Sequence, residues 1–498
     1  MTRPWFDGDA HALATAIVRG ECSAVQALQR TLTDIDEINL RLNAVCLLRP
    51  DIAHARAQAL DAELARCHDD ARDALLRARP FFGVPLLLKD LGPAVALRDL
   101  PSRLGSRALG PQGLQWSVDG TLAQRYAAAG FVAVGRTTSP EMGISASTEA
   151  LAYGGPTRNP WQPEHSAGGS SGGAAAATAS GMVTIAHAND GAGSIRIPAS
   201  ACGLIGLKPS RGLVPLGPLV GEGWGGLAID HVLTRSVRDC ALALDATAGP
   251  DPGAPYAAPP RPASFAALLA TPPKRLRIAL CNSFFEGDAV HHEVAVAVDA
   301  FARVLEGLDH EVEPARPPFT SLDVVRPVMQ VVAAGTAMLL DGLGAQLGRA
   351  VDEAALEPVV QGAWRVGREV SGIDYLRSID ALHRIGRQMA AFHERFDLLL
   401  TPTLAEPPAR LGRFAMRNPD FIDYRLGPEG LWRYTPFTPL ANATGAPSIS
   451  LPVALSPAGL PIGALLTAAF GADALLLQVA AQWDAAGPTP PRIAPSLP

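Results

Sequence analysis

The spacing of apolar and polar positions along the chain predicts alternating helices and strands. Residues 9–79 carry apolar side chains at helical spacing among many Ala, Leu and Arg residues, and Ser23 is placed to cap a helix that ends near residue 38. Short apolar runs typical of buried strands occupy 83–91, 131–135, 183–188, 275–280, 397–402, 448–455 and 462–468. Helical patterns occupy 121–130, 291–308 and 473–483. This alternation predicts an α/β fold with a mainly parallel or mixed sheet.

Two segments depart from the alternation. Residues 249–273 are rich in proline and predict a surface crossover between two halves of the chain. Residues 320–396 are mostly helical without a strand signal, which predicts a helical elaboration over one edge of the sheet. The length of 498 residues leaves the number of domains open.

Composition and charge exclude several classes of protein. Hydrophobic residues make up 48% and charged residues only 18% of the chain, so we expect a large core rather than disorder. The net charge of −6 gives no electrostatic reason to expect nucleic acid as a partner. The longest uncharged stretch, residues 435–471, is divided by six prolines and predicts strands and turns rather than a membrane span.

The N-terminus and the cysteines point to the cytoplasm. The first 20 residues mix Asp, His and Arg and lack the apolar centre of a signal peptide. The six cysteines are scattered, without a pair or a Cys/His cluster at the spacing of a metal site. We therefore expect free thiols in a reducing cytoplasm, no metal and no membrane attachment.

The most unusual local composition lies in residues 165–210, which contain two glycine-serine turns, Gly168–Gly173 and Gly191–Ser194. Each turn is followed by a segment that could be helical, so both can present backbone N–H groups to a ligand. A phosphate loop would need a lysine directly after the first turn, and none is there. Residues 168–172 also satisfy the G-x-S-x-G pattern of a nucleophile elbow, but this short pattern arises by chance in a Gly/Ser-rich connector.

Taken together, Lys89, the GGSSGG turn and the NDGAGSIR turn resemble the amidase signature family. Ser170 and Ser194 are 24 residues apart, and further similar stretches run from PFFGVPLLLKD through TRNPW to the closing GAPSISLPV, so the resemblance covers nearly the whole chain. It implies an α/β amidase signature fold, with a central twisted mixed β-sheet covered by helices on both faces. It also implies one domain over residues 1–498, with a helical N-terminal region 1–79, a core of about 80–215 and a helical elaboration of about 320–396.

The function that the resemblance implies is hydrolysis of small neutral amides by a Ser-cisSer-Lys triad. In that triad Ser194 attacks the carbonyl, Ser170 relays the proton and Lys89 is the base. Lys89 must be neutral for this, and the apolar run before it predicts a buried strand end where desolvation lowers the lysine pKa. An arginine could not take this role because it stays protonated. No cofactor is implied, and we expect a monomer or homodimer that acts on a small-molecule amide.

Residues around the triad receive supporting roles. The backbone N–H groups of Gly191, Ala192, Gly193 and Ser194 would form the oxyanion hole. Many members of the family have glycine where this chain has Ala192, whose methyl group changes the shape of the hole but leaves its N–H donor if φ stays negative. We expect Asp190 and Arg196 to brace the turn as an ion pair.

Ser171 is expected either to hydrogen-bond Lys89 or to cap the helix that follows it. The other two lysines of the chain, Lys208 and Lys274, are interpreted as solvated cations. His165 and His187 lie near the turns, but a loop histidine and a satisfied core histidine are the favoured interpretations over a Ser-His mechanism.

Residues that contact substrate are harder to identify from the sequence. The glycine turns at Gly168 and Gly169, together with Met142 and Gly143, are candidates. The segments 325–345 and 415–440 are expected to complete the pocket. The aromatic side chains of the second segment could be core residues or could line a leaving-group site; they are Tyr424, Trp432 and Tyr434.

Other functions stay open at this stage. The same fold could serve as the amidase subunit of a glutamyl-tRNA amidotransferase, although the net negative charge and the NDGAGS variant weigh against it. It could also act as an aryl acylamidase or as a carbamate or ester hydrolase. A non-catalytic binding protein is a further alternative, which the presence of all three triad residues disfavours.

Overall fold

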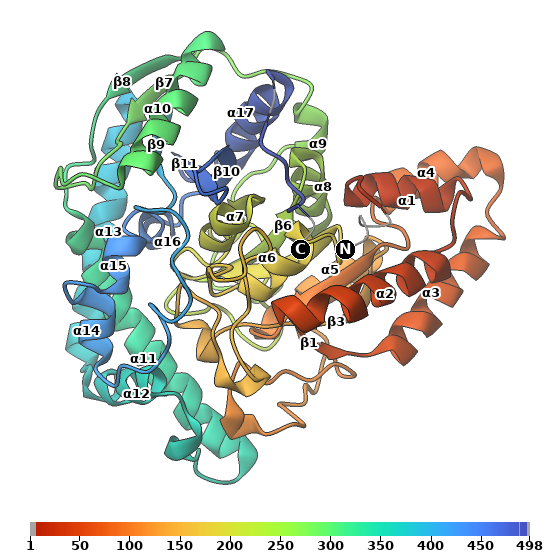
Figure 1. The fold of residues 1–498 in the computed structure, drawn as a ribbon, viewed down its shortest axis with the longest axis horizontal. Helices are drawn as coiled ribbons and strands as arrows, with labels where there is room; N and C mark the ends of the chain where they lie inside the picture. Colours follow the sequence, from red (N-terminus) through yellow and green to blue (C-terminus); the bar gives the residue numbers. More distant parts are fainter. Residues whose placement is uncertain (1–5, 488, 496–498) are drawn as a thin grey trace.

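The computed structural model describes residues 6–487 and 489–495, and in that part of the chain an eleven-stranded mixed β-sheet forms the centre (Figure 1). The order across the sheet is β1-β3-β2-β4-β6-β5-β10-β11-β9-β7-β8. The strands are β1 (Val45–Leu48), β2 (Pro85–Lys89), β3 (Val132–Thr137), β4 (Ile185–Asp190), β5 (Ile205–Lys208), β6 (Ile229–Thr234), β7 (Arg277–Leu280), β8 (Glu311–Pro314), β9 (Leu398–Pro402), β10 (Ser448–Leu455) and β11 (Pro461–Ala468).

Both parallel and antiparallel pairs occur in this sheet. Strand β2 lies between β3 and β4 and is parallel to both, and β7 is likewise parallel to β8 and β9. The strands between these two groups pair in antiparallel fashion. Every residue of β2, β6, β9 and β11 is buried, because helices cover the sheet on both faces. The α/β fold with a mixed sheet is therefore confirmed.

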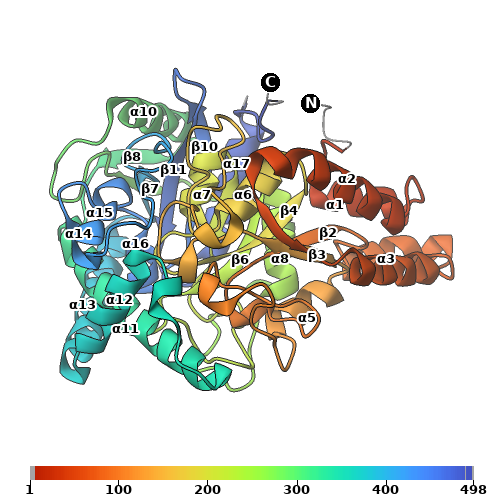
Figure 2. The same ribbon diagram turned by 60° about the horizontal axis from the view of Figure 1, so that its bottom comes forward.

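Helices surround the sheet, with α1–α4 at one end of the molecule and α11–α15 at the other (Figures 1 and 2). They are α1 (Ala10–Val18), α2 (Ala24–Leu42), α3 (Pro50–Leu64), α4 (Arg72–Ala78), α5 (Thr121–Ala128), α6 (Gly172–Ala179), α7 (Arg196–Cys202), α8 (Val237–Thr247), α9 (Phe265–Leu268), α10 (His292–Gly307), α11 (Ser321–Leu347), α12 (Pro358–Glu369), α13 (Gly372–Arg395), α14 (Phe421–Leu426), α15 (Leu431–Tyr434), α16 (Pro439–Thr444) and α17 (Asp473–Ala485). Ser23 caps α2 as predicted, in a capping box with Gln26, and the helix continues to Leu42.

The helical elaboration predicted for 320–396 consists of α11, α12 and α13, and α11 packs against both of the others. By length and composition α11 is apolar enough to cross a membrane, but here it lies against α12, α13 and α16. Within residues 249–273 the structure has the short helix α9 and no strand, in keeping with a surface crossover. The uncharged stretch 435–471 holds α16 in addition to the expected strands β10 and β11.

Candidate active site

The strand order brings two segments of the sequence together at the carboxyl ends of neighbouring strands. They are the end of β2 with Lys89 and the turn that carries Ser194. Lys89 is the last residue of β2, and the parallel neighbour β4 ends in Asn189 and Asp190, directly before the turn that carries Ser194. Because parallel strands have their carboxyl ends on the same side, the lysine and the turn meet there. Ser170 lies just before α6, and its hydroxyl oxygen is 2.7 Å from Lys89 Nζ. The Gly169–Ser170 peptide bond is cis, as the family resemblance implies.

The Lys89 side chain is fully buried, and its ammonium group has no carboxylate within ion-pair distance among the described residues. Burial lowers the pKa of Lys89 from 10.5 to about 7, although the charges of Asp230 and Asp190 act in the opposite direction. Nζ also donates to Asn189 Oδ1 at 2.6 Å. A substantial neutral fraction near pH 7 follows, as a lysine base requires.

The backbone of Lys89 is held by a second buried pair. His187 Nδ1 accepts the N–H of Lys89 at 3.2 Å, and His187 Nε2 lies 2.9 Å from Asp230 Oδ1. Burial lowers the pKa of His187, so the ring is neutral and donates its single proton to the carboxylate. The prediction of a satisfied core histidine is confirmed. His165, on a partly buried loop, has no hydrogen bond from Nδ1 within the described residues.

The turn that carries Ser194 is organised by the carboxylate of Asp190. Its oxygens accept the N–H groups of Gly193 at 2.6 Å and Ile195 at 3.0 Å, and they pair with the Arg196 guanidinium at 2.9 Å. Burial alone would raise the pKa of Asp190, but the Arg196 charge and the hydrogen bonds from Arg196 and Asn442 hold it well below its usual value. The predicted ion pair is confirmed, and it is completely buried.

The predicted oxyanion hole needs one correction. The N–H of Gly193 donates to the Asp190 carboxylate, so it is not free to contribute to an oxyanion hole as predicted. Gly193 has φ +130°, and a Cβ there would lie 2.3 Å from Thr438 Oγ1, so this position requires glycine. Ala192 does not have a positive φ, so its backbone keeps an ordinary conformation, as predicted.

Two other side chains differ from their predictions. The Ser171 hydroxyl bonds neither Lys89 nor the start of α6; it donates to the carbonyl oxygen of Asn189 at 3.2 Å. Lys208 is buried rather than solvated, because β5 lies in the middle of the sheet. Its Nζ donates to the carbonyl of Pro209 at 2.7 Å, and burial lowers the pKa of Lys208 to about 7. Lys274 is exposed, as predicted.

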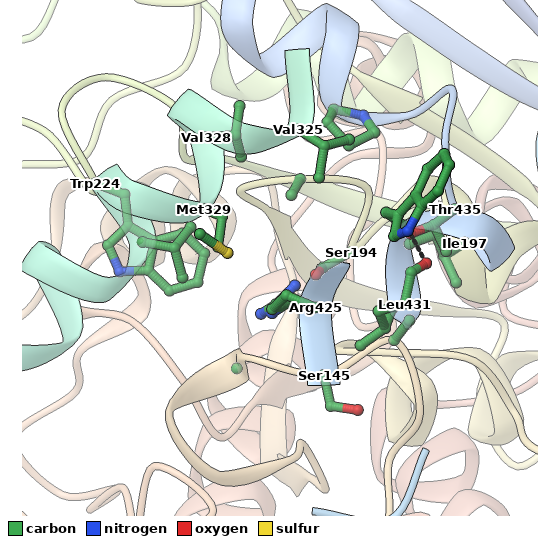
Figure 3. Close-up of a pocket in the computed structure, with 16 residues that line it drawn as sticks. Ser145, Ser194, Ile197, Trp224, Val325, Val328, Met329, Arg425, Leu431 and Thr435 are labelled. Carbon is green, nitrogen blue, oxygen red and sulfur yellow. Dashed lines mark hydrogen bonds between the residues drawn. The ribbon is translucent and has the colours of Figure 1, made fainter. Parts of the chain in front are cut away.

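Ser194 opens into a cavity whose empty space, including its mouth, is about 590 Å³ (Figure 3). Its other lining residues are Gly143, Ser145, Ala146, Ala192, Ile197, Trp224, Val325, Val328, Met329, Val332, Arg425, Leu431, Trp432, Thr435 and Pro439. Both segments expected to complete the pocket, 325–345 and 415–440, therefore contribute to its wall.

The individual substrate-contact predictions have mixed outcomes. Gly143 and Trp432 line the cavity, whereas Met142, Gly168 and Gly169 are absent from the lining and lie in tight backbone contacts or in the core. Gly143 has φ +72°, and a Cβ there would reach 2.4 Å from Leu91, so a larger residue would disturb the cavity floor. The Tyr424 hydroxyl bonds the Ser145 hydroxyl, and the Tyr434 hydroxyl accepts the N–H of Ala409. Both rings therefore lie in the core.

Sequence reasoning missed Asn189, Trp224 and Arg425. Asn189 was visible in the NDGAGS variant, at a position where a side chain leaving a parallel strand points toward Lys89. Trp224 lies in a loop and Arg425 in α14. Both lie outside the two glycine-serine turns in the sequence, and no local sequence pattern marks them as cavity residues. Within the described residues no group of three His, Cys, Asp or Glu side chains is placed to hold a metal ion, and all six cysteines are free.

Comparisons with known proteins find relatives that match nearly the whole chain. A family model described as Amidase matches residues 26–477. A 6-aminohexanoate-cyclic-dimer hydrolase of a Pseudomonas species is 34% identical over 96% of this chain and 95% of that protein. The solved structure of a 6-aminohexanoate cyclic dimer hydrolase with substrate superposes with a TM-score of 0.86 at 33% identity, covering 96% and 97% of the two chains. A bacterial aryl acylamidase gives a TM-score of 0.87 at 28% identity over 98% and 97%.

Proposed function

The chain belongs to the amidase signature family, and on that premise we propose that it hydrolyses the C–N bond of small amides through an acyl-enzyme on Ser194. The observation that carries this proposal is the contact between Lys89 and Ser170. The Nζ atom of this buried lysine, whose pKa is about 7, lies 2.7 Å from the hydroxyl oxygen of Ser170. Both groups lie at the carboxyl ends of β2 and β4, where the Ser194 turn begins.

The proposed reaction uses these groups in sequence. Neutral Lys89 takes the hydroxyl proton of Ser170, which in turn takes that of Ser194 as the Ser194 oxygen bonds to the carbonyl carbon. The N–H groups of Gly191, Ala192 and Ser194, which Asp190 does not engage, stabilise the oxyanion. The proton returns through Ser170 to the amide nitrogen, the C–N bond breaks and the amine leaves. Water then attacks the acyl-enzyme by the same relay and releases the carboxylic acid.

The wall of the cavity supports a substrate that is small and partly apolar. Val325, Val328, Met329 and Val332 of α11 line the same cavity as Ser194, together with Trp432. Relatives of this chain carry the names cyclic dimer hydrolase and aryl acylamidase, so linear or cyclic aliphatic amides and anilides are the first substrates to test. We also propose, as the sequence suggested, a cytoplasmic monomer or homodimer that needs no cofactor.

A fluorophosphonate probe tests the proposal directly. We expect stoichiometric labelling of Ser194, located by peptide mass spectrometry, and hydrolysis of 4-nitroanilides by the untreated protein. Lys89→Ala is expected to lose both the labelling of Ser194 and the hydrolysis of 4-nitroanilides, while its thermal unfolding shows a folded protein. Undiminished hydrolysis in Lys89→Ala would contradict the triad.

A further inference from the structure

Arg425 of α14 brings a positive charge into the cavity beside Ser194. It is the one charged side chain among the described residues that line this space, and Figure 3 shows its guanidinium within the cavity. Nη2 donates to the carbonyl oxygen of Ile144 at 2.6 Å, and the guanidinium lies 5.4 Å from the ring centre of Phe421. These contacts hold the side chain in place without neutralising its charge.

The rest of the Arg425 donor set is unused. Nε is buried and has no hydrogen-bond partner, and Nη1 likewise bonds no acceptor in the described part of the chain. No carboxylate of the described residues lies within ion-pair distance of it. Of its neighbours, Tyr424 is titratable but buried and neutral, because burial raises its pKa to about 12.

Three other polar side chains of the cavity wall already have hydrogen-bond partners. The Ser145 hydroxyl bonds Tyr424 at 2.7 Å, the Thr435 hydroxyl donates to the Leu431 carbonyl, and the Trp432 indole donates to Gly427. Within this wall Arg425 thus combines a positive charge with an Nη1 group that has no acceptor among the described residues. An uncompensated buried cation is costly, and an anionic ligand would remove that cost.

Building on the proposed function, we infer that the substrate of this enzyme is an amide that also carries a carboxylate, which Arg425 binds while Ser194 attacks the amide carbonyl. A guanidinium whose Nη1 group is free can donate charge-assisted hydrogen bonds to a carboxylate. This recognition would set the enzyme apart from one that accepts any neutral amide of suitable size.

Matched pairs of amides test the inference. On the acyl side, succinyl, glutaryl and adipyl 4-nitroanilides are compared with their methyl ketone counterparts, in which a neutral acetyl group replaces the carboxylate. On the amine side, N-butyryl-4-aminobenzoate is compared with N-butyryl-4-aminoacetophenone. For at least one pair we expect the carboxylate compound to have a kcat/KM roughly ten to a hundred times higher, the range for a hydrogen bond to a charged group.

The variants assign that preference to its residue. In Arg425→Gln we expect the kcat/KM of the carboxylate compound to fall close to that of its neutral counterpart. Arg425→Lys keeps the charge but not the planar guanidinium, so its ratio of the two kcat/KM values should be intermediate. Arg417→Gln removes an exposed arginine nearby in the chain and should match the wild type. Thermal unfolding and probe labelling of Ser194 show that each variant is folded.

Failure of the inference and failure of the proposed function give different results. Labelling and anilide hydrolysis without any carboxylate preference, or with a preference that survives in Arg425→Gln, would overturn the inference alone. If no amide is hydrolysed, calorimetric binding of the same pairs to Ser194→Ala still decides the matter. The inference is supported if Ser194→Ala binds the carboxylate compound more tightly than its neutral counterpart and if this difference disappears in the double variant that also carries Arg425→Gln. Equal binding of the two compounds to Ser194→Ala overturns it.

Discussion

At the scale of single residues, the hydrogen bonds of the Lys89 amine explain how it can serve as a base. A neutral amine has two N–H donors and one lone pair. Asn189 Oδ1 has no hydrogen to give, so its 2.6 Å contact must use an N–H of Lys89. That orientation leaves the lone pair free to face the Ser170 hydroxyl, 2.7 Å away. Asn189 is therefore a positioning residue for the lysine.

This arrangement predicts the pH dependence of the enzyme. In the proposed mechanism Lys89 acts as a base only when it is neutral, so kcat/KM of the wild type should rise with pH through about 7 and level off above it. Asn189→Asp adds a negative charge beside Nζ, which stabilises the ammonium and raises the pKa of Lys89. The midpoint of the pH profile should then move to higher pH by about one unit or more.

Ser171→Ala is the matched control, because its hydroxyl contacts the Asn189 backbone and not the amine. Its pH profile should have the wild-type midpoint. An unchanged midpoint in Asn189→Asp, with the protein folded, would show that this side chain does not set the state of Lys89.

At the scale of elements, we expect α11 to limit the size of the substrate. Its residues Val325, Val328, Met329 and Val332 form one wall of the cavity, while Met338 on the same helix is 73% exposed. One helix therefore presents an apolar stripe to the substrate and another surface to solvent.

Enlarging a side chain on the inner stripe should exclude bulky amides. Val328→Phe is expected to lower kcat/KM for 4-nitroanilides by roughly tenfold or more, with a smaller effect on aliphatic primary amides, because the larger ring fills space that the aryl group needs. Steady-state kinetics on both substrates measure this change. Met338→Phe places the same ring on the outer surface and should leave both values near those of the wild type; an equal loss in both variants would contradict the role of the stripe.

Local patterns predict some elements well and others poorly. Strands β2, β9 and β11 are continuous apolar runs because both faces of the sheet are covered, so their hydropathy is unambiguous. The equally buried strand β6 was missed because Asp230 and His231 interrupt its run. Asp230 is there to pair with His187 of β4, a reason that only the assembled sheet reveals.

At the scale of the whole molecule, one buried network joins distant parts of the chain. Arg196 Nη2 donates to Asn442 Oδ1 at 2.6 Å, and the Asn442 amide donates to the Asp190 carboxylate at 2.9 Å. The network thus connects the turn that carries Ser194 with α16, about 250 residues later in the sequence. Packing near the C-terminus therefore holds the turn that carries Ser194.

Removing the cation of this network should destabilise the fold. Arg196→Met leaves Asp190 buried without its partner, and we expect the free energy of unfolding to fall by about 3–5 kcal/mol, measured by chemical denaturation. Arg384→Met breaks an exposed ion pair with Asp380 on α13 and should cost about 1 kcal/mol or less. Similar losses in the two variants would argue against a stabilising role for the buried pair.

The same scale limits what the sequence can say about the site. Lys89, Ser170 and Ser194 could be named from the sequence because each lies in a local motif that resembles the amidase signature family. Arg425 lies more than 200 residues beyond Ser194, and only the packing of α14 against the core loops brings it to the cavity. Lys208 shows the opposite error: its local sequence resembles a surface turn, whereas its strand is central.

Strand β8 ends the sheet on one side, and its sequence Glu-Val-Glu-Pro has a consequence for solubility. It pairs with β7, and most of its residues are exposed. An open strand edge invites another chain to add by backbone hydrogen bonding, which is a route to aggregation. Two glutamates and a proline oppose this, since like charges repel an incoming strand and proline lacks an N–H to share. The composition that made β8 difficult to predict as a strand thus protects the enzyme from unwanted self-association.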